Sequence, residues 1–201
     1  MAEKAPQGNG DRRRVILEAA IAEFSEKGFS GARVDTIARR ARSNKQLIYY
    51  YYDSKLGLYE AVLELMISRT SELMDAHDRH DSIVDAVQDH FDNLVGRGGD
   101  EWIRFWLWEA LDSGASDAPR SRVRAKVWAR WVDEFRRAQD RGEIGRDYDP
   151  KILALAVNSI VVTPYMTPIV TKLITGKDPK GVTFRRQQQA FLDKVIKALA
   201  A

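Results

Sequence analysis

Apolar residues recur along the chain at spacings of three and four positions, the period of a helix that buries one face. Near the start, Ile16, Ala20 and Phe24 lie four positions apart, with Leu17 and Ile21 beside them on the same face. Nowhere do several β-branched residues alternate with polar ones, as a half-buried strand would require. The pattern therefore predicts an all-α fold.

Turn residues divide this pattern into separate helices. Helices are expected at about 12–27, 34–41, 45–52, 55–74, 82–95, 101–111, 120–141, 151–175 and 183–199. Gly28 supplies a left-handed stop to the first helix, and Asn44 and Ser54 are expected N-caps. Pro164 and Pro168 should kink or split the helix over 151–175, because each removes a backbone donor.

The chain ends and the composition favour a cytoplasmic protein without membrane association. Residues 1–10 are polar, carry Gly and Pro, and are expected to form a disordered arm rather than a signal peptide. The longest apolar stretch, 152–162, is interrupted by Asn158 and Ser159 and is too short to span a bilayer. Cysteine is absent, which excludes disulfides and thiolate metal sites.

Basic charge is concentrated in one stretch of the chain. The whole chain of 201 residues carries a net charge of only +3, whereas residues 33–55 alone carry +4. The basic residues of this stretch are Arg33, Arg39, Arg40, Arg42, Lys45 and Lys55, and the acidic ones are Asp35 and Asp53. Two short predicted helices are joined here by only a few residues, 42–44, so that the second helix can protrude and enter the major groove of DNA.

An ordered series of residues in the first third of the chain resembles a known family. The series consists of Ile16-Leu-Glu-Ala-Ala20, Phe24-Ser-Glu-Lys-Gly-Phe29, Ile37-Ala38, Ala41, Lys45, Ile48-Tyr49, Tyr52-Asp-Ser-Lys55 and Leu58. In order and spacing it is similar to the amino-terminal domain of the TetR family of bacterial transcriptional regulators, over roughly 12–62. The resemblance implies a helix-turn-helix DNA-binding domain over 11–60, followed by a larger helical effector-binding and dimerisation domain over 61–201.

The resemblance also implies partners and a mode of action. A homodimer would bind a palindromic double-stranded DNA operator, and a small-molecule effector in the carboxy-terminal bundle would release it, so that a repressor is expected. The alternative is a helical small-molecule-binding or scaffolding protein without sequence-specific DNA binding. Arg42 and the run of tyrosines from Tyr49 to Tyr52 are its best arguments.

Several positions depart from the family pattern. Arg42 stands where the family usually has a turn glycine, and a left-handed backbone there costs about 1 kcal/mol for Arg relative to Gly. Arg33 stands close to where a Thr or Ser often caps the second helix, and Asp35 is expected to compensate partly through the helix dipole. Gln46 and Leu47 replace small residues, which favours an operator specific to this protein.

The recognition helix over 45–52 divides into two faces. Ile48 and Tyr52, four positions apart, should face the core, because each step turns the chain by about 100°. Gln46 suits an adenine edge, and the tyrosine hydroxyls suit phosphates. The predicted DNA contacts are Arg33, Thr36, Arg42, Lys45, Gln46, Leu47, Tyr49, Tyr50, Tyr51 and Lys55. The arginines at 12–14 fit either DNA contacts or a solvated helix start.

The second half of the chain holds all five tryptophans, which either fill its core or line an effector pocket. The candidate pocket residues are Trp102, Phe105, Trp106, Trp128, Trp131, Asn158, Tyr165 and Met166. The resemblance implies that the last two helices form the dimer. The candidate interface residues on the last helix are Phe191, Leu192, Val195, Ile196 and Leu199.

No enzyme or cofactor is expected. The chain shows no Gly-rich phosphate loop and no Ser-His-Asp pattern. His77 and His80 stand at a helical i, i+3 spacing among aspartates, which permits a metal site. An exposed, charged helix junction explains these histidines equally well, and no metal is predicted.

Overall fold

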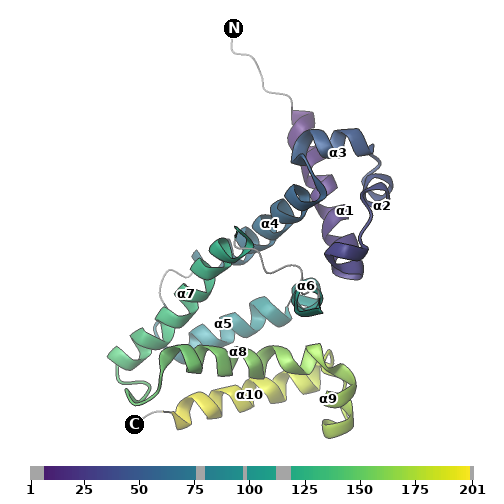
Figure 1. Cartoon of the computed structure of the whole chain (residues 1–201). Helices are drawn as coiled ribbons and strands as arrows, with labels where there is room; N and C mark the ends of the chain where they lie inside the picture. The colour runs from purple at the N-terminus through teal and green to yellow at the C-terminus, as the bar shows by residue number, and fades with distance from the viewer. Residues whose placement is uncertain (1–6, 76–79, 97–98, 112–118, 200–201) are drawn as a thin grey trace. The chain divides into compact units, whose positions relative to one another are not determined.

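The computed structural model describes residues 7–75, 80–96, 99–111 and 119–199, and every regular element in these ranges is a helix (Figure 1). The helices are α1 (Gln7–Gly31), α2 (Val34–Arg40), α3 (Lys45–Tyr52), α4 (Lys55–Asp75), α5 (Ile83–Val95), α6 (Gly99–Leu111), α7 (Pro119–Asp140), α8 (Pro150–Met166), α9 (Pro168–Thr175) and α10 (Val182–Ala198). The all-α prediction is confirmed. Of the arm predicted over 1–10, residues 7–10 are helical, and the others lie outside the described ranges.

The chain divides into two compact units. Unit 1 comprises Met1–Ser68 and Arg104–Arg120, and unit 2 comprises Arg69–Ile103 and Ser121–Ala201. The division differs from the predicted boundary near residue 60, because it falls further along α4 and assigns the second half of α6 to unit 1. The reason is packing within unit 1, where the Phe105 ring of α6 lies 5.7 Å from the ring of Tyr59.

The core of unit 1 is built from the periodic apolar residues of its helices. Ile16, Phe24, Ile37 and Ile48 come from α1, α2 and α3, and all are buried. Phe24 also packs edge to face on Tyr59 of α4, with ring centroids 5.0 Å apart. These contacts hold α2 and α3 against α1 and leave the opposite face of α3 outside the core.

A tryptophan of α6 covers a break in α1. Gly28 has φ 66° and ψ 179°, so the helix is interrupted just after Lys27, where the stop was predicted, and a further turn extends to Gly31. The Trp108 ring covers this glycine so closely that a Cβ on Gly28 would lie 2.8 Å from it. The Trp108 indole N–H donates to the carbonyl of Ser25 at 3.2 Å.

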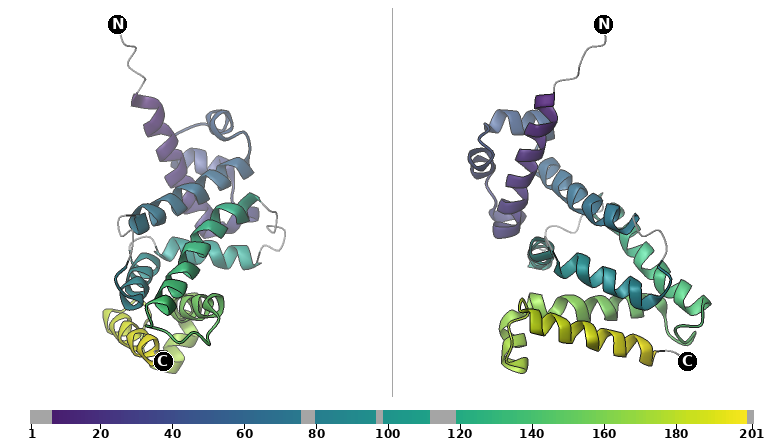
Figure 2. Two further views of the ribbon diagram at one scale, coloured as in Figure 1. Left: turned by 90° about the vertical axis from the view of Figure 1, so that its left-hand side faces the viewer. Right: turned by 180° about the vertical axis from the view of Figure 1, so that it is seen from behind.

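Unit 2 is a bundle in which α5 packs against both α8 and α10, which lie side by side in the views of Figure 2. The long helix predicted over 151–175 is split at Thr167, with a bend of 93° between α8 and α9. Pro168 begins α9, whereas Pro164 is accommodated inside α8. Within the described ranges no single helix is long and apolar enough to cross a membrane, and only the bent pair α8 and α9 together meets those criteria of length and composition.

Candidate nucleic-acid interface

The turn before α3 is set by two local features. Asn44 caps the helix, as predicted, because its side-chain oxygen accepts a hydrogen bond from the Leu47 amide at 2.7 Å. Arg42 has φ 49°, so the turn is left-handed without the usual glycine, and the expected strain of about 1 kcal/mol applies. The Ser43 amide donates to the Ala38 carbonyl at 2.9 Å and closes the turn. Together these contacts fix where α3 begins.

The two faces of α3 follow the predicted division. Ile48 and Tyr52 are buried, and the Tyr52 hydroxyl donates to the carbonyl of Arg13 at 3.2 Å. Burial raises the pKa of Tyr52, which keeps the phenol neutral. On the other face Tyr50 is 77% exposed. Lys45, Gln46 and Tyr49 are also exposed, whereas Leu47 and Tyr51 are half-buried.

Two of the predicted DNA-contacting lysines already have partners in unit 1. Lys45 Nζ donates to Asp35 Oδ2 at 3.1 Å, and this hydrogen bond raises the lysine pKa. Both side chains are exposed, so the pair is weak and open to exchange for a phosphate. Lys55 Nζ donates to the Ser30 carbonyl at 3.3 Å and lies 5.0 Å from the centre of the Phe29 ring. Lys55 thus contacts the end of α1.

The start of α2 is capped from a distance. Arg33 precedes α2 without a side-chain cap, and its own amide donates to the Glu23 carboxylate of α1 at 3.2 Å. Glu23 is buried and also lies 3.6 Å from Arg40. Asp35 in the first turn was predicted to compensate for the missing side-chain cap of α2. The hydrogen bond from the Arg33 amide to Glu23 was not predicted from the sequence. Of the predicted contacts near this end, Arg33 is exposed and Thr36 is half-buried.

Within unit 2, Trp131, Trp128 and Asn158 lie around His90, a residue that the sequence analysis did not single out. The ring of His90 stacks on Trp131 with centroids 4.0 Å apart, and its Nε2 lies 3.2 Å from Asn158 Oδ1. Burial lowers the pKa of His90 to about 4, so the imidazole is neutral near pH 7. The Trp131 indole donates to the Ala154 carbonyl at 3.1 Å. These contacts tie Trp131 and Asn158 into the packing of the bundle.

The other candidate pocket residues lie in different surroundings. Tyr165 is buried and donates to Gln188 at 2.9 Å, and burial raises its pKa to about 12. Trp102, Trp106 and Met166 are half-buried. Phe105 belongs to unit 1 and packs on Tyr59 there. Of the eight predicted residues, Trp128, Trp131 and Asn158 lie together around His90.

The candidate interface residues of α10 differ in exposure. Leu192 and Ile196 are buried inside unit 2, whereas Phe191 is 55% exposed, and Val195 and Leu199 are half-buried. The face of α10 is thus shared between the bundle core and the surface.

The possible metal site is only partly described. His77 lies outside the described residues, and His80 Nε2 lies 2.9 Å from the Asp89 carboxylate. Among the residues that the structure describes, no group of three or more His, Cys, Asp or Glu is placed to hold a metal ion.

Comparisons with known families cover both units. The family described as "Bacterial regulatory proteins, tetR family" matches residues 16–62. A second family, "Tetracyclin repressor-like, C-terminal domain", matches residues 82–193. The chain is 36% identical over 187 residues to the HTH-type transcriptional repressor SCO4008 of Streptomyces coelicolor, covering 89% of this chain and 90% of that protein.

Solved structures share the fold. The crystal structure of SCO4942 from Streptomyces coelicolor has a TM-score of 0.69 and 26% identity, covering 92% of this chain and 96% of that one. The structure of AibR in complex with isovaleryl coenzyme A and operator DNA has a TM-score of 0.68 and 20% identity, covering 94% and 98% of the two chains.

Proposed function

The chain belongs to the TetR family of bacterial regulatory proteins and is a DNA-binding transcriptional regulator, and we propose that it is a cytoplasmic repressor released from its operator by a small molecule. The exposed face of α3 carries this proposal, because it presents polar and aromatic side chains while Ile48 and Tyr52 anchor the helix to the core. The relative SCO4008, named as a repressor, supports the direction of regulation. The proposed role is binding, not catalysis.

Recognition follows from the chemistry of the side chains on that face. Gln46 offers a donor and an acceptor suited to an adenine edge, and Lys45 suits a guanine edge or a phosphate once it leaves Asp35. The hydroxyls of Tyr49 and Tyr50 suit phosphates, which fix the register of the helix on the duplex.

Lys45→Ala is expected to weaken operator binding about tenfold, because one charged contact to DNA is lost. Tyr49→Phe should weaken binding by a smaller factor, since only a hydroxyl is removed. Fluorescence anisotropy with the DNA upstream of the protein's own gene measures both effects, and circular dichroism checks the fold. Lys126→Ala, which removes an exposed lysine of α7, is the matched control. Equal affinities for Lys45→Ala and Lys126→Ala would place the recognition surface elsewhere.

We further propose that two copies pair through α8 and α10. Apolar side chains remain exposed on both helices, with Ile152 63%, Leu155 62% and Phe191 55% exposed. Exposed apolar side chains of this size favour an interface. A symmetric dimer carries two recognition helices, so the operator should be palindromic.

Phe191→Asp is expected to convert the dimer to monomers. The change removes an apolar ring from the proposed interface and buries a carboxylate in its place, which should raise the dimer dissociation constant at least about a hundredfold. Sedimentation velocity measures the oligomeric state. Tyr148→Asp, at another exposed aromatic residue in the α7–α8 connection, serves as the control. A variant at Phe191 that stays dimeric at wild-type concentrations would exclude this interface.

Release is proposed to be a population shift. An effector held in unit 2 would favour a dimer whose recognition helices no longer match the operator spacing. The apolar and aromatic side chains of unit 2, with the polar groups of Asn158 and Tyr165 among them, are chemically suited to an effector with both apolar and polar parts.

A further inference from the structure

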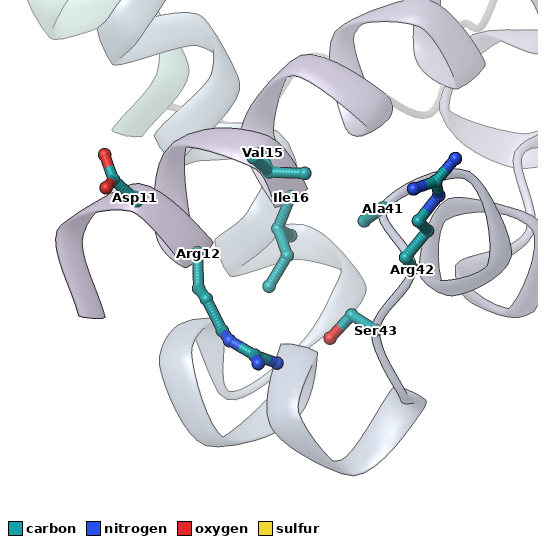
Figure 3. A pocket seen from close by; sticks show the side chains of 7 residues that line it. All are labelled: Asp11, Arg12, Val15, Ile16, Ala41, Arg42 and Ser43. Carbon is teal, nitrogen blue, oxygen red and sulfur yellow. The ribbon is translucent and has the colours of Figure 1, made fainter. Parts of the chain in front are cut away.

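A hollow of about 190 Å³ lies in unit 1 between the start of α1 and the turn that joins α2 to α3 (Figure 3). The residues that line it are Asp11, Arg12, Val15, Ile16, Ala41, Arg42 and Ser43. Ile16 and Ala41 are buried, so its inner wall is apolar and fixed by the core. The core thus holds the inner wall of the hollow in place, whereas Asp11, Arg12, Val15 and Arg42 at its rim are exposed.

One of the lining residues, Ser43, has a side-chain oxygen without a partner. The Oγ atom of Ser43 is buried and forms no hydrogen bond with any part of the chain that the structure describes. A buried hydroxyl without a partner is costly and is rare in folded proteins, unless a bound group or water satisfies it. The unpartnered Ser43 hydroxyl therefore suggests that the hollow binds a group that can accept a hydrogen bond.

The lining carries two cationic side chains, Arg12 and Arg42, and one carboxylate, Asp11. Within the described ranges, no hydrogen bond or ion pair engages the guanidinium group of Arg12 or of Arg42. Figure 3 shows the Arg12 side chain extending toward the side of Ser43, whereas the Asp11 carboxylate is turned away. The Arg42 side chain extends in another direction, so it would attract a bound anion only through its positive electrostatic potential. An acceptor seated between Arg12 and Ser43 would meet a cation and a hydroxyl donor, which favours an anion.

We propose that this hollow seats one phosphate of the operator backbone, an assignment that rests on the proposed function. Arg12 would donate charge-assisted hydrogen bonds to the phosphate oxygens, and the Ser43 hydroxyl would donate a further one. The apolar wall formed by Val15 and Ile16 keeps water from one side of the pair, which strengthens the attraction.

The position of the hollow selects DNA as the source of the phosphate. Ser43 stands two residues before Lys45, the first residue of the recognition helix. A recognition helix that enters the major groove with its N-terminal residues brings the preceding turn over the sugar–phosphate backbone. A phosphate there would fix the depth and register of α3 without reading sequence.

The test compares Arg12→Gln with Arg14→Gln, which removes an equal charge from an exposed residue on the same helix that does not line the hollow. Arg12→Gln should weaken operator binding about tenfold. The slope of log affinity against log salt concentration should fall in magnitude by about 0.9, the value for one phosphate contact. Arg14→Gln should keep the wild-type slope, and Arg12→Lys should keep most of it because the charge remains.

Ser43→Ala provides an independent measurement. It should weaken operator binding about threefold and leave the salt slope unchanged, because a hydroxyl carries no charge. The thermal midpoint of the free protein should not fall, since Ser43 Oγ has no partner within the described chain. A loss of stability without a change in affinity would mean that the hydroxyl serves the fold.

Three outcomes overturn the proposal in distinguishable ways. If wild-type protein protects no operator DNA, the proposed function itself fails, and this assignment fails with it. If wild-type protein binds but Arg12→Gln and Arg14→Gln have equal slopes, only the phosphate seat is excluded. If inorganic phosphate alone raises the thermal midpoint of wild type but not of Arg12→Gln, while the DNA slopes are equal, the hollow takes a free anion rather than DNA.

Discussion

Trp131→Ala is expected to lower the free energy of unfolding by about 4 kcal/mol. Trp131 is fully buried in unit 2, stacks on His90 at 4.0 Å and packs edge to face on Phe135 at 5.0 Å. Its removal leaves a cavity and deprives the Ala154 carbonyl of its indole donor. Chemical denaturation followed by circular dichroism measures the loss.

Two further variants separate packing from hydrogen bonding at this position. Trp131→Phe keeps an aromatic ring but not the indole N–H, so it should lose about half as much as the alanine variant. Trp128→Ala, at a half-buried tryptophan one turn earlier, should lose less than about 2 kcal/mol. Unchanged denaturation of Trp131→Ala would mean that Trp131 borders an open pocket instead of filling the core.

Gly28→Ala is expected to cost about 3 kcal/mol through two separate effects. At φ 66° an L side chain is strained by about 1 kcal/mol relative to glycine. In addition, the new Cβ would lie 2.8 Å from the Trp108 ring, and overpacking of this kind adds about 2 kcal/mol. The second effect should also release the tip of α6 from α1, since Trp108 holds the Ser25 carbonyl.

Gly176 allows the backbone strain of an alanine at positive φ to be measured without a steric clash. Gly176 has φ 68° and no atom within 4 Å of a built Cβ, so Gly176→Ala should cost about 1 kcal/mol from strain alone. Combining Gly28→Ala with Trp108→Ala should cost less than the sum of the two single changes, because the clash needs both residues. Strict additivity, or equal costs at Gly28 and Gly176, would show that the indole moves aside freely.

The sequence predicted most of the helices and the orientation of α3, because both depend on local periodicity and caps. Ile48 and Tyr52 lie four positions apart and are buried, while Tyr50 points outward, as a helical wheel requires. Asn44 accepts the hydrogen bond expected of an N-cap, and the left-handed turn at Arg42 follows from the family spacing. These features need only neighbours within a few residues.

The candidate site was predictable only in part. Lys45 and Gln46 are exposed on α3 as expected. Lys55 contacts the end of α1, and this contact could not be predicted because its partner Ser30 stands 25 positions earlier in the chain. The unpartnered Ser43 hydroxyl and the hollow beside Arg12 also required coordinates, since they arise where α1 meets the α2–α3 turn.

By itself, the sequence determined an all-helical chain with a recognition helix inside a basic stretch near its start, because the helical period, the caps and the local charge depend on consecutive residues. Only the tertiary structure decided which residues distant in sequence contact one another. Glu23 accepts a hydrogen bond at the start of α2, Trp108 covers Gly28, and His90 lies between Trp131 and Asn158. Such contacts join residues 10 to 83 positions apart, as for Glu23 with Arg33 and Trp108 with Ser25. The spacing of side chains along one helix shows which of them share a face, but not which residues of another helix will contact that face.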